Sequence, residues 1–174
     1  MEFINTIKNL IPDYAKDIRL NLDGTIARSS LEGNDAVGVA LAAAFTTSSP
    51  TLIKIIKSAN ILSAEELNGV LSASALMGMN NTWYPYTEMA HNADLKGQPA
   101  GLRMNAYANH GGIDKRRFEM YALAASIIGK CHFCVKSHFE TLLKEGMSVT
   151  QLRDVGRIAA TINAAAQVIT AEEA

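Results

Sequence analysis

The side chains best suited to catalytic chemistry lie in one short stretch, Cys131-His132-Phe133-Cys134, which is followed by His138. The two cysteines are the only ones in the chain. In a helix, positions 131, 134 and 138 are three and four residues apart, so their side chains lie along one face. Two thiols so placed can close into a disulfide and reopen. A helix N-terminus or a neighbouring imidazolium lowers a cysteine pKa until reactive thiolate exists near neutrality. The stretch therefore predicts redox chemistry at sulfur.

Glu119 is the acidic side chain that could serve this stretch, since it belongs to the helix predicted just before it. A carboxylate near His138 would hold the imidazole in one tautomer and favour its protonated form. That arrangement gives a relay from Glu119 through His138 to a thiol. The alternative for Glu119 is a solvated surface carboxylate. His132 lies inside the motif, but its side chain should point away from the face of the two cysteines, so we expect it to act through local electrostatics.

Other interpretations of the cysteine pair must be weighed against redox chemistry. A c-type haem site requires histidine directly after the second cysteine, and that position is Val135, which excludes it. A structural zinc site is the main alternative, because the two cysteines and His138 offer three ligands, with Glu119 or His110 as the fourth. An inert pair of buried cysteines is the third possibility.

Composition and charge exclude several classes of partner. The chain has 174 residues and a formal charge of −1, so it has no basic field to recruit nucleic acid or an anionic membrane. The N-terminal residues lack the pattern of a secretory signal, and no apolar stretch is long enough to span a bilayer. Neither GxGxxG nor GxxxxGK[ST] occurs, so we expect no bound nucleotide. We expect a cytoplasmic protein, in which two cysteines are more often catalytic, metal-binding or redox-sensing than a permanent cross-link.

The chain has the apolar patterning of helices almost throughout, and it contains no convincing strand. Helix starts are marked by capping residues or capping boxes at Ser49-Pro50, Ser63–Glu66, Asp114 and Ser148–Gln151. A break at Gly129 separates the helix after Asp114 from a helix that begins at about Cys131 and stops at Glu145-Gly146. The last helix carries apolar residues at three- and four-residue steps from Leu152 to Ile169. The sequence therefore predicts an all-α fold.

Irregular structure is expected in two segments, 21–35 and 92–112, where Gly, Pro, Asn and Asp accumulate. The second segment divides the single domain, residues 1–174, into an N-terminal half of about 1–91 and a C-terminal catalytic half of about 113–174. A shift of 51 positions aligns residues of the two halves: Leu67 with Phe118, Ala73 with Ala124, Leu76 with Ile127, Gly78 with Gly129 and Asn80 with Cys131. The repeat is faint. Alanine-rich helices also match one another by chance, so the alignment alone does not establish a duplication. If it is real, only the second copy carries sulfur.

An apolar and aromatic cluster precedes the second irregular segment. Its members are Met77, Met79, Trp83, Tyr84 and Tyr86. Such clusters belong to a core or a subunit interface in most proteins, and the alternative is the lining of an access channel.

Glu119 followed by Cys131-x-x-Cys134-x-x-x-His138 resembles the active-site motif of AhpD-type alkylhydroperoxidases, which belong to the carboxymuconolactone decarboxylase-like superfamily. The resemblance covers nearly the whole chain, with similar segments in the same order at residues 11–17, 77–81 and 101–105. It implies an all-helical fold of two related halves and a homotrimer. It also implies a thiol peroxidase that reduces alkyl hydroperoxides and hydrogen peroxide in antioxidant defence. The redox-active disulfide would then be the only redox group, with no bound cofactor and no metal.

The resemblance also implies a role for each residue of the motif. Cys134 would attack the peroxide and become a sulfenic acid, and Cys131 would resolve it as a disulfide. Thioredoxin-like electrostatics would instead favour Cys131 as the thiol of lower pKa. Glu119 and His138 match the proton relay of the family. The family relay includes a histidine directly before the second cysteine, whereas this chain has Phe133 there and His132 one place earlier, a rotation of about 100° on a helix.

The electron donors implied by the resemblance are a lipoylated acyltransferase and dihydrolipoamide dehydrogenase, which would make the peroxidase dihydrolipoamide-dependent. A peroxiredoxin is a further implied partner, supplied with electrons by the reduced protein. Two other functions fit the residues: a non-enzymatic dithiol redox sensor, and a decarboxylase or isomerase of the superfamily that acts without sulfur.

Overall fold

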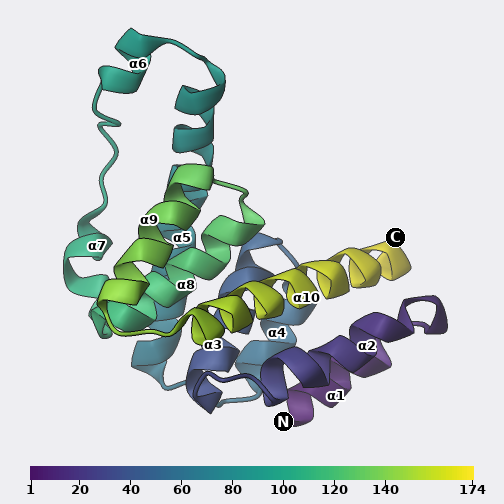
Figure 1. Ribbon diagram of the computed structural model, residues 1–174. Helices are drawn as coiled ribbons and strands as arrows, with labels where there is room; N and C mark the ends of the chain where they lie inside the picture. The colour runs from purple at the N-terminus through teal and green to yellow at the C-terminus, as the bar shows by residue number, and fades with distance from the viewer.

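The computed structural model describes residues 1–174, and every regular element in it is helical (Figure 1). The elements in chain order are α1 (Glu2–Asn9), η1 (Asp13–Ala15), α2 (Lys16–Leu22), η2 (Asp23–Ala27), α3 (Gly33–Thr46), α4 (Pro50–Ser58), α5 (Ala64–Met89), α6 (Ala93–Gly97), α7 (Asn105–Asn109), η3 (His110–Gly112), α8 (Lys115–Ile128), α9 (His132–Lys144) and α10 (Val149–Glu173). The predicted all-α fold is confirmed. No helix combines the length and the apolar character that crossing a bilayer requires.

Helices α3 and α8 form the centre of the molecule. All residues from Asp35 to Ala44 in α3 and from Phe118 to Ser126 in α8 are buried. A helix that is apolar on nearly all sides can be stable only when other elements surround it. Helices α5, α9 and α10 pack against α8, and α4, α5 and α10 pack against α3. Glu119 is carried by the buried part of α8, so the fold places this carboxylate in the interior.

The helix starts predicted from capping residues are confirmed. Ser63 accepts a hydrogen bond from the Glu66 backbone N–H while the Glu66 carboxylate accepts one from the Ser63 N–H, which completes the capping box of α5. The same reciprocal pair, Ser148 with Gln151, begins α10. Side-chain caps begin two further helices: Ser49 caps α4 and Asp114 caps α8. These signals are local, which is why they can be identified from the sequence.

The two segments expected to be irregular contain more helix than predicted. Helix α2 reaches Leu22 and continues as the π-helical turn η2, and α3 already begins at Gly33, so only residues 28–32 of the first segment are irregular. The second segment contains α6, α7 and η3. In Figure 1 the end of α5 and α6 form an arm that projects from the helical body, and the chain returns from it through residues 98–104 to α7. Beyond the arm, α7 packs against η3 and α5, and its Tyr107 hydroxyl lies 3.4 Å from the His138 Nδ1 of α9.

Candidate functional site

The turn between α8 and α9 places the two cysteines. Helix α8 ends with Gly129 at its C-cap, and Lys130 adopts the left-handed conformation with φ of 53°. The Cys131 N–H donates to the Ser126 carbonyl at 3.2 Å, which closes the end of α8. Cys131 is then the N-cap of α9, and its Sγ accepts from the Cys134 backbone N–H at 3.2 Å. The predicted helix start at Cys131 is confirmed, and it puts both sulfurs where exposed N–H groups and the helix dipole favour thiolate.

Gly129 is required by the close approach of α5 to this turn. The Asn81 side chain of α5 donates from Nδ2 to the Ala125 carbonyl at 3.0 Å. The space in which a Cβ of residue 129 would lie is occupied by that same asparagine side chain. The turn is therefore held against α5 by a hydrogen bond that only a glycine at position 129 permits.

Cys131 and Cys134 are joined as a disulfide, and both residues are buried. Beside them lies a cavity of about 280 Å³, whose lining residues are Asn80, Tyr84, Met104, Tyr107, Phe133, Cys134, Ser137 and His138. Cys134 is part of this lining, whereas Cys131 is not. Of the two cysteines, only Cys134 faces space that a small molecule can enter.

Glu119 and His138 form a buried pair beneath the cavity. The His138 Nδ1 lies 2.6 Å from the Glu119 Oε2, and each side chain is only 4% exposed. The Tyr107 hydroxyl donates to the other carboxylate oxygen, Oε1, at 2.9 Å. Burial raises the pKa of Glu119, but the hydrogen bond and charge of His138, together with the hydrogen bond from Tyr107, outweigh it, so the pKa lies below its ordinary value. The site therefore contains an ionised carboxylate in the protein interior.

An ionised Glu119 determines which nitrogen of His138 is free for chemistry. A carboxylate can only accept, so the Nδ1 that faces it carries a proton. The other nitrogen, Nε2, lies 3.2 Å from the Sδ of Met77, a weak acceptor. Nε2 is thus the nitrogen that can gain or lose a proton on the side away from Glu119.

The structure brings together four of the five residues predicted for the site, Cys131, Cys134, Glu119 and His138. His132 lies apart from them, with a side chain that is 82% exposed and with Nδ1 3.4 Å from the Glu88 Oε1 on α5. This position follows from the rotation of His132 away from the face of the cysteines.

Two side chains that contact the Glu119–His138 pair were not predicted as site residues. Tyr107 belongs to the segment expected to be irregular, where no periodic pattern marks it. Met77 was noted only as part of the apolar cluster before that segment, and it contacts His138 directly. Tyr84 from the same cluster stacks on Phe133 with ring centroids 4.4 Å apart. The cluster therefore runs from the core to the cavity wall, and its sequence pattern was the available signal for Met77.

A larger cavity of about 710 Å³ lies on the other side of the Tyr84–Phe133 pair. Its lining residues are Trp83, Tyr84, Thr87, Glu88, Lys96, Gln98, Pro99, Ala100, His132, Phe133 and Lys136. The two cavities share Tyr84 and Phe133, so this aromatic pair forms the wall between them.

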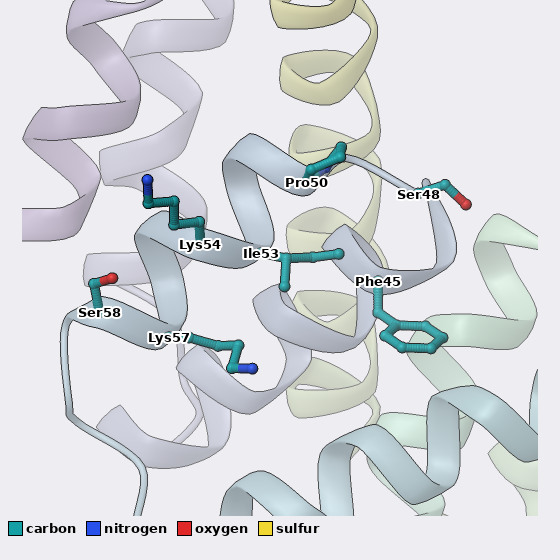
Figure 2. A pocket seen from close by; sticks show the side chains of 7 residues that line it. All are labelled: Phe45, Ser48, Pro50, Ile53, Lys54, Lys57 and Ser58. Carbon is teal, nitrogen blue, oxygen red and sulfur yellow. The ribbon is translucent and has the colours of Figure 1, made fainter.

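Figure 2 shows a different hollow, between the end of α3 and α4, at which Lys54 and Lys57 are the charged side chains. It contains no thiol, imidazole or carboxylate, so it offers no acid–base or redox chemistry of the kind found at Cys134. The structure has no group of three or more His, Cys, Asp or Glu side chains placed to hold a metal ion. His110, considered above as a zinc ligand, packs its ring near that of Phe118 at a centroid distance of 5.7 Å.

The chain is similar to known proteins over nearly its whole length. The model of the carboxymuconolactone decarboxylase family matches residues 93–174. A protein of Rhodospirillum centenum named alkyl hydroperoxide reductase AhpD is 40% identical over 173 residues, covering 98% of this chain and 92% of the relative. The proteins of the same name from Maricaulis maris and Coxiella burnetii (strain Dugway 5J108-111) are 41% and 40% identical, over 97% and 95% of this chain and 98% and 96% of the relatives.

Proposed function

The chain belongs to the AhpD family of alkyl hydroperoxide reductases, and on that premise we propose that it reduces organic hydroperoxides and hydrogen peroxide through a Cys131–Cys134 dithiol/disulfide cycle. One observation carries the proposal. Cys134 faces a cavity next to a buried carboxylate–imidazole pair, and its disulfide partner Cys131 lies outside that cavity. A thiol, a base and a second thiol are the groups that a cofactor-free peroxidase needs.

The cycle begins with the reduced protein. The Cys134 thiolate attacks one oxygen of the hydroperoxide, so an S–O bond forms, the O–O bond breaks and an alkoxide leaves as the alcohol after taking a proton. The Cys131 thiolate then attacks the Cys134 sulfur, so the S–S bond forms, the S–O bond breaks and hydroxide leaves as water after taking a proton. The two sulfurs together supply the two electrons that reduce the peroxide.

The relay residues move the protons in this cycle. We propose that His138, which lines the same cavity as Cys134, takes the thiol proton of Cys134 through Nε2, the nitrogen that does not face Glu119, and returns it to the leaving alkoxide. Glu119 stabilises the imidazolium that exists between the two transfers. His132 is not needed for this transfer, and its exposed position beside Glu88 supports only a weak electrostatic effect.

Two cysteine variants test the proposal. Reduced Cys134→Ser should consume no cumene hydroperoxide, whereas reduced Cys131→Ser should consume one equivalent per chain and stall as the sulfenic acid. Peroxide consumption and free-thiol titration measure both outcomes. Multiple turnovers in both variants would refute the assignment. Activity that survives loss of both thiols would support the sulfur-independent decarboxylase or isomerase, and slow oxidation by every peroxide in stopped flow would support the redox sensor.

The electron donor, partners and assembly rest on the family relationship. We propose that dihydrolipoamide resets the disulfide, supplied in the cytoplasm by a lipoylated acyltransferase and dihydrolipoamide dehydrogenase, with a peroxiredoxin as an alternative partner. The proposed assembly is a homotrimer. Oxidation of NADH coupled through lipoamide tests the donor, and the mass in solution relative to one chain of 18.7 kDa tests the trimer.

We also propose that residues 1–174 form a single domain built from two related halves. Two contacts support this. The Arg117 Nη1 lies 3.0 Å from the Glu66 Oε1, and the Cys131 Sγ lies 3.9 Å from the Asn80 carbonyl oxygen. Both pairs are 51 positions apart, which is the spacing of the faint sequence repeat. Equivalent residues of two related units meet in this way near a twofold axis.

A further inference from the structure

Tyr107 contacts both residues of the proposed relay but takes no part in the chemical steps of the cycle. It lies on α7 at the point where the chain returns from the projecting arm. Its hydroxyl donates to the Glu119 Oε1 at 2.9 Å and lies 3.4 Å from the His138 Nδ1. Tyr107 also lines the cavity that Cys134 faces. One side chain thus contacts both members of the relay from the substrate side.

The Glu119 carboxylate has two hydrogen-bond donors, one on each oxygen. His138 occupies Oε2, and Tyr107 occupies Oε1. Lys115, the nearest cation on α8, acts on Glu119 only through its charge, because its ammonium donates to Glu145 at 2.7 Å. A buried carboxylate oxygen that loses its donor is costly. Tyr107 is therefore what satisfies the half of the carboxylate that His138 does not reach.

The Tyr107 hydroxyl is a fixed donor. Burial, followed by the charge and hydrogen bond of Glu119, raises the pKa of this phenol far above its ordinary value, so it stays protonated. The ring is held by packing, since it meets Phe118 edge-on at 5.5 Å between centroids and stacks on His138 at 6.5 Å. Packing of the ring therefore fixes the orientation of the hydroxyl that donates to Glu119.

We propose that Tyr107 is a positioning residue of the peroxide-reducing reaction, whose hydroxyl holds the Glu119 carboxylate ionised and oriented toward His138. This inference rests on the proposed function of the site. The third group of the relay, placed by family resemblance at the position where this chain has Phe133, is then supplied from a different element. Phe133 itself contacts Tyr84 in the cavity wall. The groups that face Glu119 are Tyr107 from α7, His138 from α9 and Lys115 from α8.

The test is Tyr107→Phe in the full chain, which removes the hydroxyl and keeps the ring. We expect kcat for cumene hydroperoxide to fall about tenfold, the scale of one hydrogen bond to a charged acceptor, while KM changes little. The acid limb of the kcat profile should move to higher pH, because Glu119 loses a donor and its pKa rises. A wild-type kcat and an unmoved acid limb would overturn the proposal.

Tyr121→Phe is the matched control. Tyr121 lies on α8 two positions from Glu119, and its buried hydroxyl has no hydrogen-bond partner. Its loss should leave kcat and the acid limb unchanged. An equal fall in both variants would mean that removing any buried tyrosine hydroxyl disturbs α8, and would also overturn the proposal.

A measurement without peroxide separates this inference from the proposed function. In ¹³C NMR of the oxidised protein, the Glu119 side-chain carboxyl should titrate at higher pH in Tyr107→Phe than in the wild type. An unchanged titration refutes the role of Tyr107 whether or not the protein reduces peroxides. An inactive wild-type protein with a shifted titration would instead refute the proposed function and leave the contact between Tyr107 and Glu119 established.

Discussion

Replacing Glu119 by glutamine tests the negative charge of this side chain separately from its size and shape. Glutamine retains the size of the side chain and one acceptor oxygen, but it removes the negative charge that faces His138. The two side chains are 4% exposed and their closest atoms are 2.6 Å apart. The substitution therefore acts on a pair that water does not screen.

The expected loss follows from the geometry of this pair. With about 4 Å between the centres of charge and an effective dielectric constant of about 20, the attraction that favours an imidazolium is about 4 kcal/mol. A neutral hydrogen bond retained by glutamine returns about 1 kcal/mol. The remaining 3 kcal/mol or so corresponds to a fall in rate of about 100-fold, at about 1.4 kcal/mol for each factor of ten. General acid–base catalysis contributes effects of this size.

Stopped-flow consumption of an organic hydroperoxide by the pre-reduced protein at pH 7 measures this rate without an electron donor. Glu119→Gln should react about 100 times more slowly and still end with one disulfide per chain. Glu88→Gln is the control, because Glu88 also faces a histidine, His132, but in an exposed pair worth little. It should react at the wild-type rate. If Glu119→Gln reacts within threefold of the wild type, the buried charge is not part of the reaction.

Two predictions concern the stability of the scaffold. Ser30 donates to Asp154 through both its N–H and its hydroxyl. Burial raises the pKa of Asp154, but the hydrogen bonds from Ser30 and from two arginines outweigh it and lower this pKa from 3.8 to about 2. That difference of about 1.8 units, at 1.36 kcal/mol each, makes Asp154→Asn about 2 kcal/mol less stable in urea unfolding at pH 7, with the gap closing as the pH falls from 4 through 2. Gly129→Ala should cost about 1–3 kcal/mol in the same assay, because the new methyl group displaces Asn81. Gly78→Ala, inside the unbroken helix α5 and with open space around it, should stabilise the protein by about 0.5–1 kcal/mol.

Much of the fold could be predicted because its signals are local. The capping boxes at Ser63 and Ser148 each lie within four residues, and they mark the starts of the two longest helices. The spacing of Cys131, Cys134 and His138 likewise defines one face of a single helix. What could not be predicted depends on contacts between distant segments, such as the return of α7 from the arm.

The relay illustrates this limit. Glu119 and His138 lie on different helices, and their spacing along the chain gave no more than an expectation that they meet. Tyr107 is the stronger case, since it lies in a five-residue helix that no periodic pattern marks. Left-handed backbone at Lys130 was also unexpected, because the sequence placed the break at the neighbouring Gly129, where glycine is needed for space and not for its φ.

The position of the cysteines reconciles two arguments that conflict at the level of sequence. Cys131, as the N-cap of α9, accepts from the Cys134 N–H through its sulfur, so helix electrostatics favour its thiolate. Cys134 faces the cavity, so access favours it as the sulfur that meets peroxide. In thiol–disulfide exchange the better leaving group is the thiol of lower pKa. A dithiol donor that enters the cavity would attack Cys134 and expel Cys131 as a stabilised thiolate. In the proposed cycle, the helix N-terminus that stabilises a Cys131 thiolate would thus assist the resetting of the disulfide, and it does not require Cys131 to attack the peroxide.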